Sequence, residues 1–181
     1  MRAVLISIKP QWCDLIDTLK KTIEVRKTKP NLKTPFKVYI YCTQDKYVEF
    51  VNHNNWRGNG KVIGEFICKS TSIFRPKSLT CESSIKKASC LTVQGLIDYA
   101  GSKEHIFGWH ISDLKIYDKP KELSEFYGKC NEGCEDCYLW QNVRVNSEEF
   151  DMDCSSKYYG HIPLKRPPQS WCYVESPVMQ C

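Results

Sequence analysis

The six residues from 21 to 26, Lys-Thr-Ile-Glu-Val-Arg, carry an amine, a hydroxyl, a carboxylate and a guanidinium. Side chains alternate between the two faces of a strand, so Thr22, Glu24 and Arg26 are predicted to share one face and the two apolar residues to enter the core. This face is expected to be exposed and to edge a cleft, with Lys21 at its mouth. Such a set could grip an anion, because the Arg26 guanidinium offers a planar fork of donors. The alternative is a solvated Glu24–Arg26 ion pair contributing about 0–1 kcal/mol.

A helix before this run and a basic loop after it would position these groups. Apolar residues recur at helical spacing in the preceding segment, as Trp12, Leu15, Ile16 and Leu19. After Arg26 comes the loop of residues 27–35, whose prolines exclude a helix or a central strand. We expect phosphate contacts from the lysines around the strand, namely Lys20, Lys27, Lys29 and Lys33.

A cysteine cluster forms a second group of chemically capable residues. Cys130, Cys134 and Cys137 place three thiols within eight residues. Thiolates at this spacing are good ligands for a structural zinc ion, and Cys154 or His161 could supply the fourth ligand. A metal would also help the polar, irregular residues 138–165 to fold. We therefore predict a structural zinc site there, with a loop of free thiols as the alternative.

The same cysteine spacing occurs in the iron–sulfur sites of radical S-adenosylmethionine enzymes. In those enzymes the motif follows the first strand of a partial α/β barrel. Here it lies near residue 130, and no strand–helix repeat follows it. We set that interpretation aside.

Composition restricts the class of protein. The chain has 181 residues, of which 41% are hydrophobic, enough for one core. No apolar run approaches the roughly 20 residues that cross a bilayer, and the N-terminus does not resemble a signal peptide. The 11 cysteines cannot all pair within the chain because their number is odd. These observations indicate reduced thiols, a cytoplasmic location and no membrane partner.

Charge is distributed unevenly along the chain. Residues 1–129 hold 22 Lys and Arg against 13 Asp and Glu, whereas residues 130–181 hold 4 against 8. The net charges are thus +9 and −4. A basic body attracts phosphate backbones through counterion release, although many soluble domains with such an excess bind no nucleic acid.

The pattern of the chain predicts an α+β fold: a mostly antiparallel β-barrel with short peripheral helices and an irregular lobe that contains cysteines. Strands are expected at residues 4–8, 22–26, 36–42, 60–68 and 105–117, and from residue 170. Helices are expected at 44–52 and after Thr92, the latter ending at Gly101. Residues 69–91 are expected to be an irregular insertion, and Lys119-Pro120 a turn.

Five short stretches resemble the ASCH domain family of the PUA-like superfamily, in particular a phage-type subgroup without an assigned function. The run Lys21-x-x-Glu24-x-Arg26 is similar to the family signature, except that Leu19 stands at its usual glycine. The other stretches are residues 6–10, 62–66, 108–114 and 166–171. The resemblance covers most of residues 3–175 and implies a PUA-like barrel formed by residues 1–129 and 166–181. Residues 130–165 would then be an insertion.

The resemblance also implies two classes of function. One is a module that binds RNA or a modified nucleoside through a basic groove near residues 20–33. The other is an enzyme, either an amidohydrolase that deacetylates acetylated cytidine or a ribonuclease, with Lys21, Thr22 and Glu24 as catalytic residues. In the deacetylases the position of Glu24 is a threonine, and a carboxylate there would keep the Lys21 amine protonated. We therefore favour the binding module.

Overall fold

The computed structural model describes residues 2–80, 83–129 and 159–175. Its strands are β1 (Arg2–Ile8), β2 (Ile23–Arg26), β3 (Phe36–Cys42), β4 (Lys61–Phe74), β5 (Ile106–Lys121), β6 (Tyr127–Lys129), β7 (Tyr159–Pro163) and β8 (Trp171–Glu175). The helices are α1 (Pro10–Asp17), α2 (Ser84–Ser89) and α3 (Val93–Ala100), with two 3-10 turns, η1 (Pro76–Ser78) and η2 (Leu123–Glu125).

The strands form one mixed sheet in the order β2-β5-β4-β3-β1-β8-β6-β7. Every pairing is antiparallel except that of β1 with β3. The predicted α+β class and the mostly antiparallel sheet are therefore confirmed. The predicted barrel needs a correction, because β2 and β7 end the hydrogen-bonded order without pairing with each other. Long β4 and β5 bend through three register shifts, which curls the sheet without closing it.

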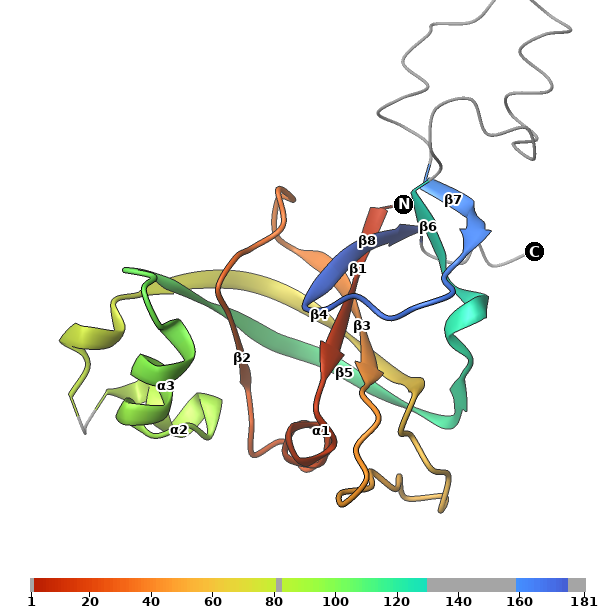
Figure 1. Cartoon of the computed structure of the whole chain (residues 1–181), viewed down its shortest axis with the longest axis horizontal. Coiled ribbons are helices and arrows are strands. Elements are labelled where there is room, and N and C mark those ends of the chain that lie inside the picture. The colour runs from red at the N-terminus through yellow and green to blue at the C-terminus, as the bar shows by residue number, and fades with distance from the viewer. Residues whose placement is uncertain (1, 81–82, 130–158, 176–181) are drawn as a thin grey trace, which may run out of the picture.

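α1 packs against one face of the curled sheet, and α2 and α3 lie beside its β2 edge (Figure 1). α1 follows β1 directly, and Pro10 occupies the first turn, where its missing N–H costs no hydrogen bond. α2 and α3 pack beside β2, where β4 ends and β5 begins. Among the described residues, no helix combines the length and the apolar character that crossing a membrane requires.

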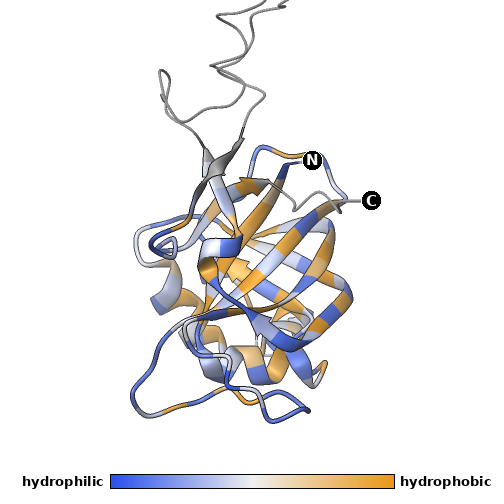
Figure 2. Cartoon of the chain, turned by 90° about the vertical axis from the view of Figure 1, so that its right-hand side faces the viewer, coloured by the Kyte–Doolittle hydropathy of each residue, from blue (hydrophilic) through white to orange (hydrophobic). Residues whose placement is uncertain are grey.

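The central strands are buried on both faces. One face of β1 and β3 packs on α1 through Val4, Ile6, Val38 and Ile40. The opposite face, which includes Leu5, packs against β8 and η2. Figure 2 shows apolar residues running along these strands. Each fully buried Ile or Leu contributes about 1.5–3 kcal/mol, so this core fixes the position of β1.

Trp109 of β5 links the sheet across the core. It is fully buried, and its ring packs edge-on against Phe36 of β3 at 5.8 Å and against Trp171 of β8 at 6.0 Å. Aromatic pairs of this geometry add about 0.5–1.5 kcal/mol each beyond their buried area. β5 therefore holds β2, its neighbour in the sheet, close to the β1–β8 region.

The helix predicted at residues 44–52 is wrong, because asparagine and aspartate side chains replace the helical hydrogen bonds. Asp45 accepts from the backbone N–H groups of Tyr47 and Val48, at 2.8 and 3.2 Å. Buried Asn52 donates to the carbonyl oxygens of Tyr117 and Asp118, at 2.8 and 3.0 Å. Side chains of these types compete with helix formation by bonding the nearby backbone.

Two further sequence expectations are corrected, and one is confirmed. Residues 69–91 are not an irregular insertion throughout, since they include the end of β4, η1 and α2. β5 continues through Lys119-Pro120, where a turn was predicted. The helix after Thr92 is confirmed as α3: the Thr92 hydroxyl accepts from the Gly95 N–H at 2.9 Å, and Gly101 follows with φ 60°.

Candidate functional site

The junction between α1 and β2 turns at Leu19. This residue has φ 56°, a left-handed conformation that glycine adopts easily and leucine rarely. The side chain is 65% exposed, so the prediction that Leu19 faces the core is wrong. The turn is closed by the Lys21 N–H, which donates to the carbonyl oxygen of Leu15 at 2.8 Å. Leucine thus adopts the backbone conformation that a glycine would favour at this position.

The Lys21 side chain is held inside the protein by three contacts. Its Nζ donates to the carbonyl oxygen of Ser89 in α2 at 2.8 Å and lies 3.3 Å from Glu24 Oε2. The same nitrogen lies over the ring of Trp12, 5.4 Å from its centre. The nitrogen is therefore held by a backbone carbonyl oxygen beside a carboxylate and an aromatic face, and it is not free to attack a substrate.

Glu24 and Arg26 lie side by side on β2, as the strand pattern predicted. Glu24 Oε1 lies 2.9 Å from Arg26 Nη2, which also donates to the carbonyl oxygen of Ser7 in β1 at 2.6 Å. Arg26 Nη1 reaches the carbonyl and hydroxyl oxygens of Ser170, at 3.5 and 3.4 Å. The guanidinium therefore connects β2 to β1 and to the start of β8.

The three charged groups are buried, which corrects the expectation of an exposed strand face. Lys21, Glu24 and Arg26 are only 3%, 6% and 8% exposed. The strand pattern predicted the common face of Glu24 and Arg26, with Lys21 at its corner, but the chain segments that cover this face come from elsewhere in the sequence. Buried charges are tolerated in a folded protein when they are paired. Removing one partner of such a cluster lowers the free energy of unfolding by about 3–5 kcal/mol.

The pairing in this cluster is incomplete. Glu24 Oε2 lies within ion-pair distance of Lys21 but makes no hydrogen bond of good geometry, and Arg26 Nε has no hydrogen-bond partner in the described structure. Each unsatisfied buried polar atom costs about 1–3 kcal/mol. The cluster thus contains two polar atoms that are shielded from solvent and lack hydrogen bonds.

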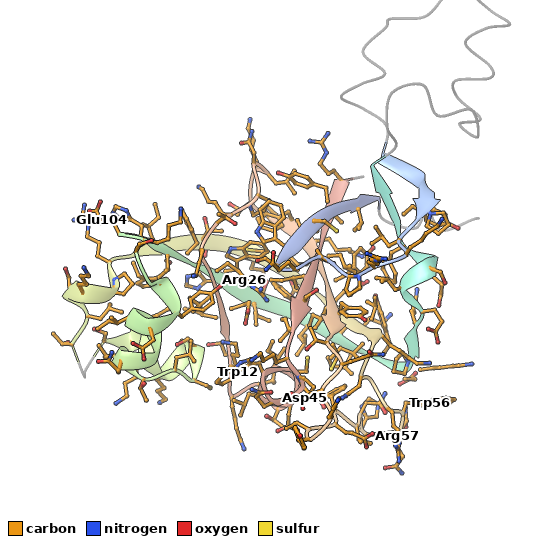
Figure 3. The ribbon with its side chains drawn as sticks, in the orientation of Figure 1. Trp12, Arg26, Asp45, Trp56, Arg57 and Glu104 are labelled. Atoms are coloured by element: carbon orange, nitrogen blue, oxygen red, sulfur yellow. The ribbon has the colours of Figure 1, made fainter. Side chains whose placement is uncertain are left out.

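The cluster lines a cavity of about 410 Å³, which we call the central cavity. Figure 3 shows Trp12 and Arg26 between α2 and α3 on the left and β1 with α1 on the right. Besides the cluster, the wall includes Ser7, Lys9, Gln11, Trp12, Thr43, Leu91, Tyr99 and Gln169. Burial raises the pKa of Tyr99, with a smaller contribution from the Glu24 carboxylate, so its phenol stays a neutral hydrogen-bond donor.

The other predicted site residues lie around the cavity or away from it. Lys20 is exposed, and its carbonyl oxygen accepts from the Cys90 thiol at 3.3 Å. Exposed Lys27 lies over the ring of Tyr99, 5.4 Å from its centre, and does not itself line the cavity. Thr22, Lys29 and Lys33 are exposed and do not line it.

Several wall residues were not predicted as site residues. Ser7 and Lys9 lie in the stretch 6–10, and Gln169 lies in the stretch 166–171. Both stretches carry the family resemblance, and that was the signal that could have identified them. Tyr99 and Leu91 carried no such signal, because they reach the cavity through α3 and the segment before it.

The predicted zinc ligands Cys130, Cys134, Cys137 and Cys154 lie outside the described residues, as does the side chain of His161. Within the described ranges, no group of three or more His, Cys, Asp or Glu residues could hold a metal ion. Zinc stays a prediction from the cysteine spacing. We expect about one zinc per chain in protein prepared without chelator, and a loss of most of it in Cys134→Ser. Elemental mass spectrometry measures both, and equal low zinc in both proteins would contradict the prediction.

No protein-family model and no curated protein matches this sequence. The structure is similar to the crystal structure of ASCH from Zymomonas mobilis, with a TM-score of 0.57 and 18% identity over 96% of this chain and 87% of that chain. Crystal structures of two mutants of that protein give the same TM-score at 17% and 18% identity, covering 90% and 88% of those chains. The chain therefore has an ASCH-domain fold, as its sequence motifs predicted.

Proposed function

We propose that this protein binds RNA and that the central cavity holds one nucleotide of it. The observation that carries the proposal is the buried Lys21–Glu24–Arg26 cluster, which lines a cavity and keeps polar atoms without partners. The volume of the central cavity, about 410 Å³, falls within the range of small-ligand sites. Buried charges that line a cavity are more typical of binding sites than of structural cores.

Each type of wall residue suits a part of a nucleotide. Arg26 and exposed Lys9 provide positive charge for a phosphate, and Arg does so with a planar fork of donors. The Glu24 carboxylate can accept hydrogen bonds from an exocyclic amino group of a base. Trp12 and Tyr99 provide aromatic faces on which a base can stack, worth about 1–3 kcal/mol for each base.

Binding is tested by titrating a fluorescent single-stranded RNA of ten nucleotides with the protein at several salt concentrations. The logarithm of the association constant should fall linearly with the logarithm of salt concentration, by about 0.7 for each phosphate contact. Lys9→Gln should reduce that slope by about 0.7. Lys69→Gln is the matched control, since exposed Lys69 lines no part of the cavity. The absence of any binding at low salt would contradict the proposal.

The enzyme hypothesis is tested with acetylated cytidine. We expect no release of acetate, because Lys21 Nζ donates to the Ser89 carbonyl oxygen and lies beside the Glu24 carboxylate, so it is not free to act as a nucleophile. Acetate is measured by an enzyme-coupled assay, with Lys21→Ala as the comparison. Turnover by the wild-type protein that disappears in Lys21→Ala would make the protein an amidohydrolase. Cleavage of the RNA during the binding titration would favour the ribonuclease alternative.

A further inference from the structure

Two more hollows adjoin the central cavity and share wall residues with it. One, the α2 hollow, has a volume of about 550 Å³, is lined by Lys86, Lys87 and Cys90, and shares Leu91 with the central cavity. The other, the Pro167 hollow, has about 590 Å³ and shares Ser7, Thr43 and Gln169. The two outer hollows share no wall residue with each other, so each adjoins the central cavity separately; we call the three spaces together the row.

The row is strongly positive. Its walls contain one acidic residue, Glu24, against six basic residues: Lys9, Lys21, Arg26, Lys86, Lys87 and Lys165. Glu24 lines only the central cavity, so the charged side chains in the walls of the two outer hollows are all basic. A wall of this kind attracts a ligand with several negative charges along its length.

The α2 hollow is fixed to the central cavity by hydrogen bonds. Lys21 Nζ donates to the carbonyl oxygen of Ser89, and the Thr22 N–H donates to that of Ala88, both at 2.8 Å. Exposed Lys86 and Lys87 lie on the same short helix, and neither forms an ion pair with another described residue. Their ammonium groups are thus held beside the cavity and are free to meet phosphates.

The Pro167 hollow is fixed in a similar way. The Ser7 hydroxyl donates to the carbonyl oxygen of Pro168 at 2.6 Å, and the Ser7 N–H donates to that of Ser170 at 2.9 Å. These bonds hold the segment before β8 against β1. Exposed Lys165 and the Tyr41 ring contribute to the wall on this side.

We infer that the ligand is a single strand of at least three nucleotides, whose neighbours on either side of the central nucleotide occupy the α2 hollow and the Pro167 hollow. This inference rests on the proposed function. A free nucleoside would leave both outer hollows and their three lysines unused. A duplex keeps its bases paired and stacked, so none could enter the central cavity without flipping out. An unpaired strand can occupy both outer hollows and can also place an unpaired base in the central cavity.

The test compares AMP, CMP, GMP and UMP with single-stranded RNAs of three and six nucleotides and with a six-base-pair RNA duplex, at one salt concentration. Affinity should rise at least about tenfold from the best mononucleotide to the trinucleotide of the same base. Lys86→Gln with Lys87→Gln should weaken hexanucleotide binding about five- to tenfold and lower the salt slope by about 1.4, leaving mononucleotide binding unchanged. Lys69→Gln with Lys103→Gln removes the same charge from exposed positions outside the row and should change neither.

The outcomes separate this inference from the proposed function. The inference would be overturned if mononucleotides bound as tightly as the longer single strands. It would also be overturned if the Lys86→Gln, Lys87→Gln variant bound the hexanucleotide as the Lys69→Gln, Lys103→Gln control does. Either result would leave the proposed function standing. Duplex binding as tight as that of the single strand would also overturn the inference. If none of these RNAs or mononucleotides binds, the proposed function itself fails.

Discussion

Glu24→Ala is expected to lower the free energy of unfolding by about 3–5 kcal/mol, because it leaves two buried cations without their shared carboxylate. Lys21 and Arg26 are 3% and 8% exposed, so water cannot replace the lost partner without opening the site. The loss is measured by urea unfolding followed by circular dichroism. It should be accompanied by loss of RNA binding, since Glu24 lines the central cavity.

Glu49→Ala provides the control for this measurement. Glu49 also pairs with an arginine, Arg57, at 2.9 Å, but the two side chains are 50% and 76% exposed. Exposed pairs of this kind contribute about 0–1 kcal/mol, so this variant should remain nearly as stable as the wild type. If Glu24→Ala lost as little as Glu49→Ala, the charged cluster would be solvated, and the buried site described here would be wrong.

Arg26→Lys is expected to weaken binding of a single-stranded hexanucleotide by about ten- to a hundredfold, the effect of losing one or two charge-assisted hydrogen bonds. Arg26 Nη2 is already engaged with Glu24 and with the Ser7 carbonyl oxygen. Arg26 Nη1 also reaches Ser170. The guanidinium has more N–H donors than these partners use, whereas the three donors of a lysine ammonium would be used up by Glu24, Ser7 and Ser170.

The control for this prediction is Arg57→Lys, which makes the same chemical change at an exposed arginine outside the three hollows. It should bind RNA as the wild type does. Circular dichroism of both variants shows whether each is folded, so that weaker binding by Arg26→Lys is not confused with unfolding. Equal affinity of a folded Arg26→Lys variant and the wild type would remove Arg26 from the site.

The sequence predicted the common face of Glu24 and Arg26 because residue alternation along a strand is a local property. Burial of that face could not be predicted in the same way. It depends on Ser89, Leu91 and Tyr99, which follow β2 by more than sixty residues and lie in or beside helices. One of those helices, α2, falls where the composition indicated an irregular insertion. The residues of the site were therefore partly predictable, and their environment was not.

Local side-chain chemistry explains why some elements predicted from the sequence were wrong. Residues 44–52 have apolar residues at helical spacing, yet Asp45, Asn52 and Asn59 bond the surrounding backbone and hold a loop instead. Leu19 was expected in the core because it continues the apolar spacing of α1, but the helix ends at Asp17 and the next turn exposes it. The strands of the core were predicted well, since their burial comes from long apolar runs.

Nuclear magnetic resonance gives the most direct test of whether the central cavity binds RNA. The protein, labelled with nitrogen-15, is titrated with an unlabelled single-stranded hexanucleotide, and the amide, indole and guanidinium N–H signals are followed. We expect the largest shifts at the Trp12 indole, at Arg26 Nε–H and at the backbone amides of Ser7 and Gln169, all from residues lining the cavity. Small shifts at those four groups, with the largest changes on the exposed part of β4 around Lys69, would contradict the account.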